Sequence, residues 1–234
     1  MQVQKIKDII SHYKNYLLSK DNREHLYLYD ILQNFQVHWG LAKDPLHEMI
    51  DQSIESQESR TLWKRANYDP KERMFKFAQI NPDYVVQMFR TAFDEDKSID
   101  RRVDRWFFYA EQMLQELRRT NPTSVVNNHF QDHSMLSLYL ACAYPEKYAY
   151  YDKRCFVETL RITKANNFQS IDDLPRFFKM LNTFDTFMKR DPEIFAAHLM
   201  RLDGDHFYKG YTRMMISECL FVFFAKSEKK GVRG

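Results

Sequence analysis

Glycine is scarce in this chain: only five of its 234 residues are glycine, at positions 40, 204, 210, 231 and 234. Tight hairpins and phosphate-cradling loops depend on glycine, because it adopts backbone conformations that other residues avoid. At these positions the glycines form no GxxxxGK[ST], GxGxxG or GxSxG motif. We therefore expect no nucleotide hydrolysis within this chain, no catalytic residues and no cofactor.

Cysteine and long apolar runs are also scarce. Cys142, Cys155 and Cys219 are odd in number and widely spaced, so they predict no disulfide framework. The first ten residues, MQVQKIKDII, lack the apolar core of a signal peptide. The longest apolar run, CLFVFFA at 219–225, falls far short of the ~20 residues that a membrane span needs. We expect a soluble, cytoplasmic protein with no membrane partner.

A large net charge is missing as well. The 35 basic and 32 acidic residues give a formal charge of +3. This balance is too even to indicate a polyanionic partner by net charge alone. Any nucleic-acid-binding surface must therefore come from a local cluster of cations.

The prolines that are present mark helix starts. Five of the seven follow Asp or Asn, at 44–45, 69–70, 81–82, 121–122 and 191–192. An Asp or Asn side chain caps free backbone N–H groups, and proline fits the first helical position because it has no N–H to satisfy. Each pair therefore predicts the start of a helix. Pro145 predicts the end of the apolar segment 134–144.

Helical periodicity agrees with these starts. From Ser98 onward one face of a long helix is apolar, with Trp106 and Phe107 in the middle of the stripe and Arg105 on the opposite face. Similar stripes run over 174–188 and 194–202, and no segment shows sustained alternation with period two. We predict an all-α, compact multi-helix domain of roughly ten helices.

The sequence also suggests how this domain is organised. We divide it into an N-terminal helical segment, 1–60, a main helical domain, 61–226, and a basic tail, 227–234, with the first two forming one continuous globule. The acidic stretch DQSIESQESR at 51–60 is the best candidate for a mobile joint.

Cations cluster between residues 60 and 76, where six of them face only Asp69 and Glu72. Such a cluster favours contact with nucleic-acid phosphates. Alternatively, it pairs internally with the acidic residues of 44–58. The candidate phosphate contacts in this stretch are Arg60, Lys64, Arg65, Lys71, Arg73 and Lys76, and Arg101, Arg102 and Arg105 join them from the long helix.

Aromatic residues lie near these cations. Trp63, Tyr148, Tyr150 and Tyr151 are candidates for stacking on bases. Tyrosine is equally typical of helix junctions, where the ring is buried and the hydroxyl stays hydrated, and we favour this packing role.

Two histidines have the spacing of a zinc site. His129 and His133 are four residues apart, but the glutamate that a zinc-protease motif places after the first histidine is replaced by Phe130. We predict that no metal binds here and that Asp132 or Ser134 caps the following helix.

Four stretches resemble the helical N-terminal region of a subset of bacterial McrB-like AAA+ proteins, the motor subunits of modification-dependent (type IV) restriction systems. They are SRTLWKRANYDPKERMFKFAQINPDYVVQMFRTAFDEDKSIDRRVDRWFFYAEQML, NPTSVVNNHFQDHSMLSLYLACAYPEKYAYYD, DLPRFFKMLNTF and GDHFYKGYTRMM. The similarity covers roughly residues 30–225. Such proteins carry a Walker motor after this region, and none is present here, so the chain is either an excised domain or a stand-alone relative.

The resemblance implies a recognition or regulatory module of a restriction or antiphage defence system. In that family the N-terminal domains recognise targets, commonly modified DNA, while the downstream AAA+ motor drives a partner nuclease. Two functions stay open: a module that binds DNA through the local cations, or a protein-interaction module that binds no nucleic acid.

Overall fold

The computed structural model describes residues 1–234 except 21, 56–61, 63–67, 121–126, 167–171 and 232–234, and for 226–231 it describes the backbone alone. Over these ranges the chain forms eleven α-helices and no β-strand, as the sequence predicts. They are α1 (Val3–Leu17), α2 (Tyr27–His38), α3 (Leu46–Ser53), α5 (Pro70–Ile80), α6 (Pro82–Ala92), α7 (Ile99–Thr120), α8 (His133–Ala143), α9 (Lys153–Ile162), α10 (Leu174–Met188), α11 (Pro192–Met200) and α12 (Met214–Gly231).

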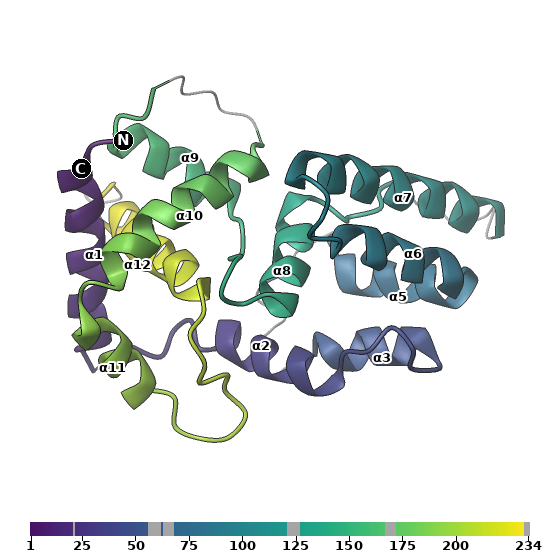
Figure 1. The fold of residues 1–234 in the computed structure, drawn as a ribbon, viewed down its shortest axis with the longest axis horizontal. Helices are drawn as coiled ribbons and strands as arrows, with labels where there is room; N and C mark the ends of the chain where they lie inside the picture. The colour runs from purple at the N-terminus through teal and green to yellow at the C-terminus, as the bar shows by residue number, and fades with distance from the viewer. Residues whose placement is uncertain (21, 56–61, 63–67, 121–126, 167–171, 232–234) are drawn as a thin grey trace.

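The helices form two groups (Figure 1). The terminal-helix group consists of α1 and α9 to α12, with α1 packed against α10, α11 and α12. The middle-helix group consists of α3, α5, α6 and α7. Helices α2 and α8 pack against each other between the groups, α2 also contacting α3 and α12 and α8 contacting α7.

The described part of the 1–60 segment shares one core with the rest of the described chain, and α1 packs on α12 at the other end of the sequence. The arrangement differs from the sequence-based division at the C-terminal end. The residues 227–231 that we assigned to a tail continue α12 up to Gly231. The proposed joint at 51–60 falls partly in α3, and residues 56–60 lie outside the described ranges.

Three of the predicted Asx-Pro starts are helix starts in the structure. Asp69 caps α5, Asn81 caps α6 and Asp191 caps α11, each accepting a hydrogen bond from a backbone N–H of the first turn at 3.1–3.2 Å. Helix α3 also begins at the pair 44–45, but its N-cap is Pro45 and not Asp44, and it makes no side-chain hydrogen bond. The pair at 121–122 lies outside the described residues.

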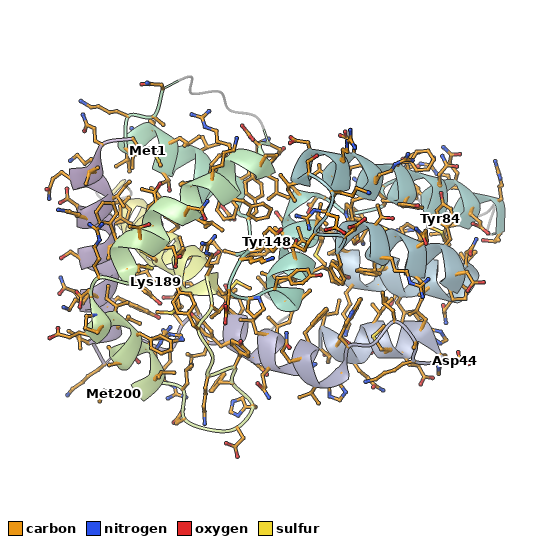
Figure 2. All side chains as sticks on the ribbon, in the orientation of Figure 1. Met1, Asp44, Tyr84, Tyr148, Lys189 and Met200 are labelled. Carbon is orange, nitrogen blue, oxygen red and sulfur yellow. The ribbon has the colours of Figure 1, made fainter. Side chains whose placement is uncertain are left out.

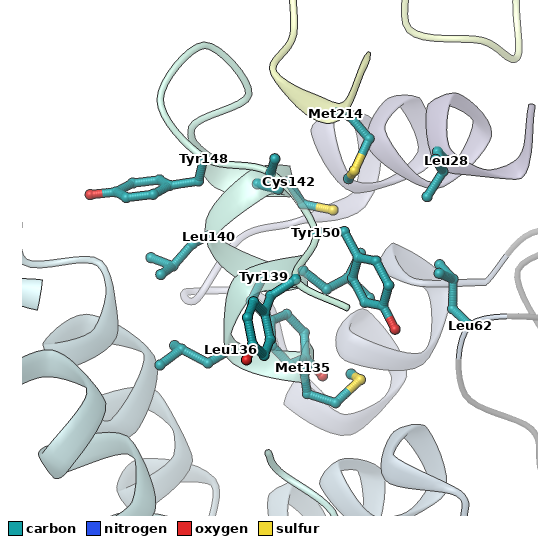
Figure 3. Close-up of a cluster of buried hydrophobic side chains, with 14 of the residues drawn as sticks. Leu28, Leu62, Met135, Leu136, Tyr139, Leu140, Cys142, Tyr148, Tyr150 and Met214 are labelled. Atoms are coloured by element: carbon teal, nitrogen blue, oxygen red, sulfur yellow. The ribbon is translucent and has the colours of Figure 1, made fainter. Parts of the chain in front are cut away.

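Apolar stripes supply one continuous core that runs through both groups. Figure 3 shows part of it around α8, where Tyr139, Leu140 and Cys142 lie among side chains from α2 and the start of α12. All three cysteines are buried free thiols. In α7, Trp106 is buried as predicted, whereas Phe107 is only partly buried, one correction to the predicted stripe.

Candidate functional site

The predicted basic stretch at 60–76 does not form one exposed cationic surface in the described residues. Lys71 is largely buried, and its ammonium group pairs with Asp51 at 2.9 Å and with Glu55. This matches the alternative interpretation, in which the stretch pairs with the acidic residues upstream. Lys71 is therefore a structural link between α3 and α5, and the prediction that it contacts phosphate is wrong for this conformation. Arg60, Trp63, Lys64 and Arg65 lie outside the described residues.

The remaining cations of the stretch differ in accessibility. Arg73 is partly buried, with its guanidinium 5.5 Å from the ring centroid of Phe130. Lys76 is exposed and forms a surface ion pair with Glu72 at 3.1 Å. Such exposed pairs contribute little to stability, so the ammonium group of Lys76 remains available to an anionic ligand.

Arg102 is buried and satisfied by the protein itself. Its guanidinium donates hydrogen bonds to the Ala92 carbonyl at 3.1 Å, to the Glu95 carboxylate at 2.8 Å and to the Tyr148 hydroxyl at 2.5 Å. Burial tends to raise the pKa of Glu95, but hydrogen bonds from Lys147 and Tyr148 and the charge of Arg102 hold this pKa below its ordinary value. The prediction that Arg102 contacts phosphate is therefore wrong; it joins α7 to the junction after α8.

Arg101 and Arg105, by contrast, lie together on the exposed face of α7. They line a groove of about 530 Å³ between α6 and α7, called here the α6–α7 groove. Within the described part of the chain neither guanidinium forms an ion pair. The other residues lining the α6–α7 groove are Gln87, Thr91, Asp94, Lys97, Arg102 and Asp104.

Sequence reasoning missed one side chain of this groove, Lys97, and one beside it, Phe108. Lys97 lies in the turn before α7, so helical periodicity does not extend to it and its place in the lining required the folded arrangement. Phe108 is 48% exposed and lies beside Arg105, whose guanidinium is 5.7 Å from the ring centroid. An exposed ring next to a cation is suited to stacking on an unpaired base.

The predicted tyrosine stacking surface is not accessible. Tyr148, Tyr150 and Tyr151 are all at least nine-tenths buried. Tyr148 lies near the middle of the molecule (Figure 2), where its ring packs against Phe178 with centroids 4.7 Å apart. The Tyr151 hydroxyl donates a hydrogen bond to Asp172 at 3.1 Å. These rings serve the helix junction, and the stacking prediction for them is wrong in this conformation.

Both histidines lie near the Phe107 ring, whose centroid is 6.1 Å from that of His129 and 4.8 Å from that of His133. The Nδ1 atom of His129 accepts a hydrogen bond from the backbone N–H of Gln131 at 2.9 Å. Asp132 caps α8 by accepting one from Met135 N–H at 3.0 Å, as predicted. Among the described residues, no group of three or more His, Cys, Asp or Glu side chains is placed to hold a metal ion.

A buried ion pair lies between the terminal-helix group and α2. Glu218 is fully buried and Arg201 is 4% exposed; the Nη1 atom of Arg201 donates to Glu218 at 2.6 Å, and its Nη2 atom contacts the same carboxylate. The hydroxyls of Tyr13 and Tyr29 donate to Glu218 at 2.6 and 2.5 Å. His198 lies against Arg201, with Nδ1 3.0 Å from Nη2. This Arg201–Glu218 cluster links α1, α2, α12 and the end of α11.

The pKa shifts of Glu218, Tyr13 and Tyr29 show which groups of the Arg201–Glu218 cluster are charged. Burial opposes ionisation of Glu218, but the adjacent Arg201 charge and its hydrogen bonds hold the pKa of Glu218 below the ordinary value. Burial and the Glu218 charge raise the pKa values of Tyr13 and Tyr29. An ionised carboxylate, a permanent cation and two neutral phenols, all shielded from water, form a structural ion pair, not a site for proton transfer to a ligand.

His198 makes the stability of this cluster depend on pH. Burial, helped by the Arg201 charge, lowers the pKa of His198 to about 3, whereas an unfolded histidine titrates near ~6.5. Stability from neutral His198 is thus fully present above pH ~6.5 and is lost as pH falls toward 3. Between pH 8 and pH 5 we expect this group to account for a loss of about 2 kcal/mol, measured by urea unfolding.

His198→Gln is expected to reduce that loss, because glutamine keeps a polar group beside Arg201 but does not titrate. His206→Gln, at an exposed histidine, is the matched control and should keep the wild-type dependence on pH. An unchanged dependence in His198→Gln would show that other groups cause the acid sensitivity.

Comparison of the chain with models of known protein families, with curated proteins and with solved structures yields no match. Among the described residues, no helix combines the length and the apolar character needed to cross a membrane.

Proposed function

We propose that this chain is a recognition module of a McrB-like restriction or antiphage defence system and that it contacts nucleic-acid phosphates at the α6–α7 groove. The observation that carries the proposal is the position of Arg101 and Arg105, exposed, without ion pairs in the described residues and together on one groove. A phosphate backbone is the ligand that matches a row of free cations. In this proposal a partner AAA+ motor hydrolyses nucleotide and a partner nuclease cleaves DNA.

The charges of the groove fit a contact that positions the ligand and does not read its sequence. Lys97, Arg101 and Arg105 outnumber the two carboxylates of the lining, Asp94 and Asp104. The Nζ atom of Lys97 and the Oδ2 atom of Asp94 are 4.0 Å apart, which makes a weak, exposed ion pair. A phosphate can compete with Asp94 for this ammonium group. Arginine contacts to phosphate fix register on a nucleic acid without specifying bases. Gln87 and Thr91 add neutral hydrogen-bonding groups on α6.

Replacing Arg101 and Arg105 together with glutamine should weaken binding to labelled DNA. Each lost phosphate contact removes ~0.9 from the slope of log affinity against log salt on duplex DNA, so the double variant should lose up to about 2 units of slope. We expect at least a tenfold weaker affinity at ~50 mM salt, measured by fluorescence anisotropy on duplex DNA, single-stranded DNA and RNA.

Lys20→Gln/Lys179→Gln is the matched control, because it removes two exposed cations, one after α1 and one on α10, and neither lysine lines the α6–α7 groove. It should bind like the wild type, and thermal melting should show all variants folded. If the groove variant and the wild type bind every nucleic acid with the same affinity and slope, or if no nucleic acid binds at all, the groove is not a nucleic-acid interface. The protein-interaction alternative then takes precedence.

A further inference from the structure

A second cationic groove lies in the terminal-helix group, between α1, α10 and α11. It has a volume of about 450 Å³ and is called here the α1–α10 groove. Phe187 is part of its lining, and two cations lie over this ring, the Lys7 ammonium at 5.8 Å and the Arg190 guanidinium at 5.4 Å from the centroid. Both cations are exposed, and neither forms an ion pair within the described part of the chain.

An apolar pocket of about 260 Å³ adjoins this groove, since Asp191 and Ile194 line both. Its walls are mainly Met188, Pro192, Ile194, Phe195, Tyr211 and Met215. Pockets for whole small molecules are usually ~300–1,000 Å³. This one is smaller, which suits the single buried anchor side chain that dominates many protein interfaces.

The carboxylates around these two hollows are already matched by cations of the chain. Lys14 pairs with Asp191 at 2.8 Å and with Glu193 at 2.6 Å. Lys189 and Arg213 both pair with Asp185, at 2.9 and 3.1 Å, so three cations offset the three carboxylates. The positive charge left without a partner is therefore that of Lys7 and Arg190, and it favours an acidic ligand.

We propose that this surface docks an acidic, apolar peptide segment of a partner protein. One large apolar side chain of the segment enters the pocket beside α11, and carboxylates next to it meet Lys7 and Arg190. Methionine side chains on the pocket wall fit this role because they adapt to different apolar anchors.

The docking surface lies in the terminal-helix group, whereas the α6–α7 groove lies in the middle-helix group, and the two share no lining residue. In Figure 2, Lys189 lies in the terminal-helix group and Tyr84 lies on α6, in the middle-helix group. A target and a partner can therefore be bound at the same time. The docking proposal does not depend on nucleic-acid binding.

Selection of a displayed library of random twelve-residue peptides on the immobilised full chain tests this proposal. We expect the enriched peptides to share one Leu, Ile, Met or Phe flanked by Asp or Glu. A synthetic peptide of that consensus should bind at least tenfold more weakly to Lys7→Gln/Arg190→Gln than to the wild type. Lys20→Gln/Lys179→Gln, which removes two exposed cations elsewhere, should leave its affinity unchanged.

Methionine methyl resonances locate the anchor side chain. Bound peptide should shift the methyl signals of Met188 and Met215 in the pocket but not that of Met200, which is 85% exposed at the end of α11. Octanoate and benzoate test whether a small amphiphilic carboxylate binds in place of a peptide. Analytical sedimentation tests whether the chain associates with itself.

Four results would overturn the proposal. In the first, selection enriches no acidic, apolar consensus, and in the second, the peptide binds both double variants with equal affinity. In the third, octanoate or benzoate binds saturably at these methyl groups and the peptide does not. In the fourth, the chain forms a dimer that Lys7→Gln/Arg190→Gln dissociates. The last two would assign the surface to a small amphiphilic acid or to a second copy of the chain.

Discussion

Replacing Arg201 with methionine is expected to lower the free energy of unfolding by about 3–5 kcal/mol. The variant keeps much of the side-chain volume but removes the guanidinium that holds buried Glu218 in its ionised form. Glu218 must then either remain charged without a cation or take up a proton, and both states cost free energy. Urea unfolding at neutral pH, followed by far-UV circular dichroism, measures the loss.

A matched series separates the buried charge from lost packing. Arg190→Met removes an exposed arginine and should change stability by no more than ~0.5 kcal/mol. The double variant Arg201→Met/Glu218→Leu removes both charges and should recover part of the loss, since replacing both partners of a buried pair by apolar groups is often tolerated. Loss below ~1 kcal/mol in Arg201→Met would mean that water reaches Glu218, and the cluster would not hold the helices together.

Helix positions were predictable because their signals are local. Asp69, Asn81 and Asp191 cap helices within three residues of their own position, so a short stretch of sequence contains the complete signal. The partners of Glu218 could not be predicted in this way, since Tyr13 lies 205 residues away in sequence and meets it only after α1 and α12 pack. A glutamate directly before the apolar run CLFVFFA does signal a buried, paired charge, but not the partner.

Candidate binding residues could be predicted where helical periodicity decides exposure. The sequence places Arg105 on the polar face of α7, and Arg101, four residues earlier, falls on the same face; both are exposed. Arg102 lies three residues after Ile99 and four before Trp106, so the same periodicity places it on the apolar stripe, where the structure buries it. Its partners, Glu95 and Tyr148, come from other segments and required the folded arrangement.

Trp106 and Phe107 illustrate the same rule at neighbouring positions. Successive residues point about 100° apart around a helix, so two neighbours cannot both face the centre of one core. Trp106 takes the central position and is 1% exposed, whereas Phe107 lies at the edge of the stripe against the two histidines. The expectation that both rings lie in the middle of the stripe is therefore correct for Trp106 and wrong for Phe107.

Truncating Trp106 to alanine should therefore cost about 3–5 kcal/mol of unfolding free energy, the usual range for a large buried aromatic side chain. The indole ring packs against Phe89 and Tyr139, with centroids 5.4 and 5.6 Å away, and its Nε1–H donates to the Gln131 carbonyl at 3.1 Å. Alanine leaves a cavity between α6, α7 and α8 and an unpaired carbonyl before α8. Urea unfolding of the purified variant measures the cost.

Phe107→Ala is the neighbouring comparison and should cost less than Trp106→Ala, because its ring already contacts solvent. Arg105→Ala, exposed on the same helix, should cost well under ~1 kcal/mol, since it breaks no ion pair among the described residues. Trp106→Phe should fall between wild type and alanine, because a phenyl ring fills part of the cavity but donates no hydrogen bond. Equal losses for Trp106→Ala and Arg105→Ala would show that α7 presents a different face to the core.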